Sequence, residues 1–167
     1  MNASMVIMGV AGCGKSSLAA AIAASEQMAL VEGDDRHSPE NREKMRQGIA
    51  LTDADREGWL DDLAQTLAAH PHGYVLTCSA LRRSYRERLR QGAPALRFVF
   101  LDISRDAAVE RVKARAAHYF SASLVDSQFA TLEPPVGEPG VLRVDALASP
   151  AQLQAQVAAW LHAADPA

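Results

Sequence analysis

The stretch that decides the fold is Gly9-Val10-Ala11-Gly12-Cys13-Gly14-Lys15-Ser16. It matches the phosphate-loop pattern G-x-x-x-x-G-K-[ST], in which the backbone N–H groups of a glycine-rich turn converge on phosphate oxygens. The apolar run at residues 5–8 predicts a buried strand before the loop, and the Ala-rich run at residues 16–27 predicts a helix after it. Because this strand–loop–helix context is the one the motif requires, all eight residues are candidate ATP-binding residues.

Two side chains of this stretch have expected roles. The Lys15 ammonium would neutralise the β and γ phosphates, and the Ser16 hydroxyl would bind Mg²⁺. The N-terminus of the following helix adds a dipole that favours an anion. The alternative is a glycine-rich turn with an exposed lysine, which the complete motif disfavours.

Apolar strand patterns alternate with helical patterns along the whole chain. Strands are predicted at residues 5–8, 29–31, 74–78, 96–102 and 141–144. Helices are predicted between them, with N-caps at Ser38, Thr52 and Ser104. Strands separated by helices indicate βαβ units, so we expect an α/β fold with a parallel sheet covered on both faces, in a single domain over residues 1–167. Residues 133–140 are predicted to be a loop.

Composition excludes several classes of protein. The chain has 167 residues, 49% hydrophobic and 22% charged, which is typical of a globular protein and not of a disordered one. The net charge of -3 argues against a general nucleic-acid binder. No apolar run approaches the roughly 18 residues of a membrane span. The two cysteines form no CxxC pair and no charged leader is visible, so we expect no membrane partner and a cytoplasmic setting.

Acidic residues at strand ends are the candidates to help hold Mg²⁺. Glu32 and Asp34 follow the second predicted strand, at the edge where open α/β sheets place their ligands. Asp102 ends the fourth strand, but it is better explained as a strand-end acid that precedes a helix. We therefore expect Glu32 to contribute to the metal site, through water where its extra methylene requires it.

Several further motifs carry a resemblance to a known family. They are Glu32-Gly33-Asp34-Asp35, Pro39-Glu40-Asn41, Thr52-Asp53-Ala54-Asp55-Arg56, Cys78-Ser79-Ala80-Leu81-Arg82-Arg83, Lys113-Ala114-Arg115 and Ser127-Gln128-Phe129. With the phosphate loop, this set resembles the gluconate kinases of the shikimate-kinase-like P-loop family, over about residues 5–145. The resemblance implies a five-stranded parallel sheet of order 2-3-1-4-5, a mobile lid at roughly residues 113–133 and commonly a homodimer. It also implies transfer of the γ-phosphoryl of ATP to the 6-hydroxyl of D-gluconate, with Mg²⁺.

The same resemblance implies roles for individual residues. Lys15, Asp34 and Arg115 are implied as catalytic residues, and Arg111 as a further ATP-binding residue. The implied substrate-binding residues are Asp34, His37, Arg56, Arg83, Arg86, His118 and Gln128. An arginine suits the gluconate carboxylate because its planar fork donates two parallel hydrogen bonds. Where the family usually has Asp-Gly-Asp this chain has Glu32-Gly33-Asp34, and Arg36 stands where the family has an apolar residue.

Simpler explanations apply to several of these side chains. Arg82, Arg88 and Arg90 are expected on the solvated face of a helix, Trp59 in the core, and Cys78 as a packed thiol. Cys13 lies near a helix N-terminus, which would favour a reactive thiolate, unless the thiol is buried and inert. For the whole protein, one alternative is another small-molecule kinase of this fold, such as a shikimate kinase. The other is a non-catalytic nucleotide- or RNA-binding module that uses the arginines at 82–90. The acidic balance and the lack of interleaved aromatic residues there argue against RNA.

Overall fold

A computed structural model describes residues 2–115 and 122–163 of the chain. Its centre is a five-stranded sheet of order β2-β3-β1-β4-β5 in which every neighbouring pair is parallel. The strands are β1 (Met5–Met8), β2 (Ala29–Glu32), β3 (Tyr74–Thr77), β4 (Arg97–Asp102) and β5 (Val141–Asp145). The predicted strands, their parallel pairing and the 2-3-1-4-5 order are confirmed.

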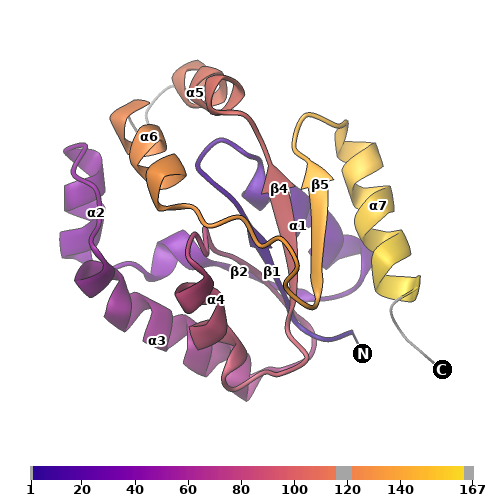
Figure 1. Cartoon of the computed structure of the whole chain (residues 1–167). Helices are drawn as coiled ribbons and strands as arrows, with labels where there is room; N and C mark the ends of the chain where they lie inside the picture. The colour runs from indigo at the N-terminus through magenta and orange to yellow at the C-terminus, as the bar shows by residue number, and fades with distance from the viewer. Residues whose placement is uncertain (1, 116–121, 164–167) are drawn as a thin grey trace.

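Helices connect the strands and cover both faces of the sheet, as right-handed βαβ connections require (Figure 1). They are α1 (Lys15–Ser25), η1 (Gly33–Arg36), α2 (Pro39–Arg46), α3 (Asp53–Ala69), α4 (Arg83–Arg90), α5 (Arg105–Ala114), α6 (Ala122–Thr131) and α7 (Pro150–Ala163). Helix α1 packs against α7, while α3 packs against α4 on the other side of the sheet. The central strand β1 is consequently buried at every position.

Local signals fix where three helices begin. The Ser38 hydroxyl accepts a hydrogen bond from the Asn41 backbone N–H at 3.1 Å, with Pro39 in the first turn of α2. Thr52 and Asp55 exchange hydrogen bonds in a capping box at the start of α3. The Ser104 hydroxyl caps α5. These caps satisfy backbone donors that a helix start leaves unpaired, and all three were predicted.

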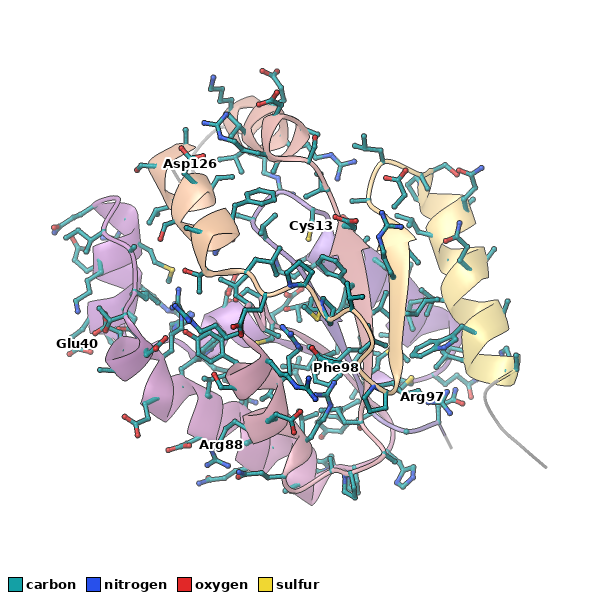
Figure 2. All side chains as sticks on the ribbon, in the orientation of Figure 1. Cys13, Glu40, Arg88, Arg97, Phe98 and Asp126 are labelled. Atoms are coloured by element: carbon teal, nitrogen blue, oxygen red, sulfur yellow. The ribbon has the colours of Figure 1, made fainter. Side chains whose placement is uncertain are left out.

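Helix α6 is an α-helix that the sequence did not indicate. Its Leu124 and Val125 are buried, and the helix packs against α5 near the carboxyl ends of the strands. Asp126, labelled on α6 in Figure 2, forms an ion pair with Arg105 of α5 at 2.5 Å. Tertiary packing therefore stabilises this short helix, which periodicity alone did not reveal.

Membrane-spanning helices were searched for over the described ranges 2–115 and 122–163. None of the helices there combines the length and the apolar character that crossing a bilayer requires.

Candidate active site

A cavity of about 340 Å³ lies at the carboxyl ends of β1, β2 and β3. The phosphate loop forms one wall, and the segment between β2 and β3 forms the opposite wall, with α5 and α6 above them. Its lining residues are Ala11, Gly12, Gly14, Lys15, Ser16, Ser17, Asp34, His37, Met45, Ala50, Leu51, Arg56, Trp59, Ser79, Val112, Arg115, Leu124, Ser127 and Gln128. Open α/β sheets bind ligands at this edge, where the strand order reverses.

The phosphate loop needs glycine at positions where the backbone is crowded. Gly9 has φ 145°, and a Cβ there would lie 2.7 Å from Cys13 Sγ and 2.9 Å from the Leu101 carbonyl oxygen. Gly12 has φ 83°, and a Cβ there would lie 2.8 Å from the Ala108 carbonyl oxygen. Since L side chains rarely adopt such φ values, the motif glycines are required by the shape of the turn.

The Lys15 ammonium is held above this loop. Its Nζ donates to the Gly9 carbonyl at 2.9 Å and to the Val10 carbonyl at 3.2 Å, and Lys15 lines the cavity. The backbone carbonyls hold the cation beside the turn without neutralising its charge. The side chain is thus placed to meet phosphate oxygens that enter the loop.

Glu32 joins the phosphate loop to the neighbouring strands. Its Oε2 accepts hydrogen bonds from Ser16 Oγ at 3.0 Å and from Thr77 Oγ1 at 2.6 Å. The Thr77 hydroxyl in turn accepts from the Gly33 backbone N–H at 3.1 Å. A hydroxyl and a carboxylate held side by side are the oxygen ligands that Mg²⁺ prefers, so the donor set fits this metal.

The acceptor wall begins with the 3₁₀ turn η1, which follows β2. The turn exposes Asp34 into the cavity. His37 at its end is 7% exposed, and its ring stacks on Trp59 with 4.1 Å between ring centroids. Trp59 Nε1 donates to the Gly33 carbonyl at 2.8 Å. Trp59 is buried as expected, and it also lines the cavity.

His37 is uncharged at neutral pH. Burial lowers its pKa from 6.5 to about 4, aided by Arg56 and Arg42 and opposed by Asp34. A neutral imidazole offers one donor and one acceptor, which suits a ligand rich in hydroxyl groups.

Arg56 is a buried cation in the same wall. It is 8% exposed, lines the cavity, and donates from Nη1 to Tyr85 Oη at 3.0 Å. Over residues 2–115 and 122–163, no acid forms an ion pair with it. A buried guanidinium without a carboxylate partner is costly unless a ligand supplies one.

Three predicted residues of α5 and α6 lie at the cavity or beside it. Arg111 donates to the Gly12, Cys13 and Ala146 carbonyls at 3.2, 3.3 and 2.9 Å, so it supports the loop from behind. Arg115 directly follows α5 and lines the cavity. Gln128 Oε1 accepts from the Ala11 N–H at 2.6 Å.

Two parts of the predicted site extend beyond the described residues. His118 lies outside the part of the chain that the structure describes, as does the middle of the expected lid, residues 116–121.

The substrate-binding roles predicted for two arginines of α4 do not fit the structure. Arg86 was expected to bind substrate, but its side chain is fully buried and bonded to Glu138 at 2.6 Å and to the Ala80 carbonyl at 2.7 Å. Arg83 is exposed and its guanidinium faces Glu87 at 3.5 Å, outside the cavity lining. Neither position fits the substrate role, because Arg86 is already neutralised inside the protein and Arg83 points to solvent.

Arg90 was expected on the solvated face, and this is wrong. Its side chain is 14% exposed, bonds Glu138 at 3.0 Å and lies 4.6 Å from the ring centroid of Phe98. Figure 2 shows Phe98 in the interior of the molecule. A buried acid from the loop after α6 therefore draws two arginines of α4 inward.

Both cysteines are buried and free. Burial raises the pKa of the Cys78 thiol to about 12, which confirms the expected packed thiol. Cys13, labelled in Figure 2, belongs to the phosphate loop, and it is only 1% exposed, so its burial favours the inert alternative over a reactive thiolate.

Sequence reasoning missed several residues near the cavity. Ser79 follows β3 at the ligand edge, so the rule that singled out Glu32 and Asp34 would also have found it. Met45, Ala50 and Leu51 come from the end of α2 and the loop before α3, and no local pattern marks them. Tyr85 was expected on the apolar face of a helix and within a family motif but had no assigned role, although its hydroxyl contacts Arg56.

A phosphate loop at the carboxyl ends of a 2-3-1-4-5 parallel sheet, facing a polar second wall, defines a P-loop kinase. Comparison with known families agrees, since residues 5–135 match a family described as an AAA domain.

Individual relatives narrow this class. The chain is 46% identical to the gluconokinase of Gluconobacter oxydans over 144 residues, which cover 84% of this chain and 80% of that protein. The crystal structure of a gluconokinase from Sinorhizobium meliloti superposes with a TM-score of 0.90 at 43% identity, covering 97% and 93% of the two chains. A sugar kinase from Janibacter superposes with a TM-score of 0.92 at 38% identity, covering 98% and 96%. The chain belongs to the gluconokinase family.

Proposed function

We propose that this protein is a gluconokinase, which transfers the γ-phosphoryl of ATP to the 6-hydroxyl of D-gluconate. The acceptor oxygen forms a bond to the γ-phosphorus while the bond to the β–γ bridging oxygen breaks, and the hydroxyl proton is released. The observation that carries the proposal is a cavity with the phosphate loop on one wall and, on the other, the buried Arg56, with which no acid of the described residues forms an ion pair. A triphosphate and a small anionic acceptor suit these two walls.

On the phosphate wall, the backbone of the loop and the Lys15 ammonium bind and orient the triphosphate. Ser16 and Glu32 would hold Mg²⁺, which neutralises phosphate charge when it is bound. Arg111 keeps the loop in shape through the Gly12 and Cys13 carbonyls. Positioning and charge neutralisation supply most of the catalysis in phosphoryl transfer, so this wall needs no covalent chemistry.

On the acceptor wall, Asp34 receives or orients the proton of the attacking hydroxyl. Asp34 is exposed in the 3₁₀ turn and lines the same cavity as the phosphate loop. His37 and Gln128 present neutral polar groups for the acceptor hydroxyls. Arg56 binds the carboxylate, which gives the guanidinium the anion that no described acid supplies.

Four further expectations extend the proposal beyond the cavity. Residues 113–133 act as a lid that closes over ATP and excludes water, bringing Arg115 to the transferring phosphoryl. The whole chain acts as one kinase domain in the cytoplasm. Two copies associate as a homodimer, and the molar mass in solution tests this directly.

A coupled assay of ADP release tests the reaction itself. The purified protein receives MgATP with D-gluconate, with shikimate, or with no acceptor. We expect fast ADP release with gluconate alone. Equal release without an acceptor would indicate a simple ATPase, preference for shikimate would reassign the acceptor, and no release in any arm would indicate a binding module.

A further inference from the structure

A hydrogen-bonded chain behind Arg56 is not used by the reaction as described so far. We propose that Tyr85, held by Asp53, is a positioning residue that aims the Arg56 guanidinium at the carboxylate of the acceptor. The inference rests on the proposed function, because it assigns to Tyr85 the selectivity for an anionic acceptor.

The geometry places the tyrosine hydroxyl between a cation and an acid. Arg56 Nη1 donates to Tyr85 Oη at 3.0 Å, and the Arg56 guanidinium carbon lies 5.6 Å from the centre of the Tyr85 ring. Tyr85 Oη donates to Asp53 Oδ1. Arg82 Nε lies 3.6 Å from the same carboxylate oxygen. Asp53 comes from the first turn of α3 and Tyr85 from α4, so these hydrogen bonds also link two helices.

The direction of each hydrogen bond follows from the groups involved. The hydroxyl has one proton, and Asp53 accepts it, so the oxygen lone pairs are left for Arg56. Burial and the hydrogen bond to Asp53 raise the pKa of Tyr85, which keeps the phenol protonated at neutral pH. Tyr85 therefore acts toward Arg56 as an acceptor only.

A neutral hydrogen-bond acceptor beside Arg56 leaves the guanidinium charged, whereas a carboxylate there would not. An acid in contact with Arg56 would neutralise it and compete with the carboxylate of the substrate. The phenol fixes the guanidinium yet leaves its charge for the ligand, while Asp53 stays one hydrogen bond further away. A guanidinium that is oriented before binding loses less side-chain entropy when the ligand arrives.

The experiment compares Tyr85→Phe with wild type, using D-gluconate and its uncharged amide, gluconamide, as acceptors. Phenylalanine keeps the buried ring and removes only the hydroxyl. We expect the KM for gluconate to rise about tenfold, with kcat and the KM for ATP changing less than about threefold. The preference for gluconate over gluconamide should fall by a similar factor, because only the charged acceptor depends on the aimed guanidinium.

Two further variants make the result decisive. Tyr74→Phe removes a hydroxyl at the start of β3, outside the cavity lining, and should leave all constants unchanged. Asp53→Ala removes the exposed carboxylate that holds the Tyr85 hydroxyl, and it should raise the KM for gluconate about threefold. This variant replaces Tyr85→Phe if that protein fails to fold.

The outcomes separate this inference from the proposed function. If wild type does not phosphorylate gluconate, the proposed function is wrong. If wild type is active and folded Tyr85→Phe keeps its KM and its preference for gluconate, the positioning role is wrong. A loss of melting temperature with equal losses for both acceptors would show that Tyr85 only supports the packing of α3 on α4.

Discussion

Ser16 Oγ donates a hydrogen bond to Glu32 Oε2 at 3.0 Å. This contact joins the first turn of α1 to the end of β2, so the group expected at Mg²⁺ and the start of the acceptor wall are held together. Glu32 is fixed on its other side by the Thr77 hydroxyl at 2.6 Å. The longer side chain of Glu32, compared with aspartate, thus has a defined position.

Glu32→Gln should weaken the use of Mg²⁺ without unfolding the protein. The amide can keep a hydrogen bond to Ser16 but lacks the negative charge that a divalent cation requires. We expect the Mg²⁺ concentration for half-maximal activity to rise about tenfold, while calorimetry shows unchanged binding of ADP without metal. Glu26→Gln is the matched control, because Glu26 pairs with His162 of α7 and lies outside the cavity lining. An unchanged Mg²⁺ dependence would remove Glu32 from the metal site.

Lys15→Ala and Asp34→Asn should both abolish most turnover, for different reasons. Lys15 acts on the phosphates, so its loss weakens charge stabilisation in the transition state. Asp34 lies on the acceptor wall, so the Asn variant should still bind ATP with nearly normal affinity. Calorimetric titration with a non-hydrolysable ATP analogue measures this difference. Lost nucleotide affinity in Asp34→Asn would place Asp34 at the metal instead.

Arg115→Ala should lower kcat by at least about tenfold, which corresponds to roughly 1.4 kcal/mol of barrier. Arg115 directly follows α5 and lines the cavity, where an added cation would stabilise charge on the transferring phosphoryl. The Kd for ATP should change less than kcat. Lys113→Ala, two residues earlier and outside the cavity lining, is the control. Full activity of Arg115→Ala would exclude the proposed role in the lid.

The buried Arg86–Glu138 pair should make the stability depend on pH. Burial alone would raise the pKa of Glu138, but hydrogen bonds from Arg86 and Arg90 outweigh it and hold the pKa below its ordinary value of 4.5. A lowered pKa stabilises the folded state above pH 4.5, and this contribution is lost as the pH falls through the folded-state pKa.

Glu138→Gln tests this pair through unfolding in denaturant between pH 3 and pH 8. At neutral pH the variant should be destabilised by about 3 kcal/mol, because two buried guanidinium groups lose their counter-ion. The difference from wild type should shrink below pH 4.5 as Glu138 becomes protonated. A constant difference at every pH would show that the charge of Glu138 does not contribute.

The sequence predicted the strands and the phosphate wall because their signals are local. An apolar run, a glycine pattern and a following helix occupy adjacent residues, and short-range sterics fix their geometry. The inward turn of Arg86 depends instead on Glu138, 52 residues away in a loop that composition describes only as Pro- and Gly-rich. Helix α6 likewise depends on packing against α5. Interactions between distant segments decide which arginine is free for a ligand.

The acceptor wall is built almost entirely from one uninterrupted stretch, η1 to α3, between two neighbouring strands. A gene segment for residues 34–70 could be replaced by its counterpart from another kinase of this fold, with the nucleotide-binding half left untouched. Several contacts join this segment to the rest of the protein, and Tyr85 on α4 makes two of them, with Arg56 and with Asp53. A chimera that seeks a new acceptor must therefore take residue 85 from the same donor as the grafted segment.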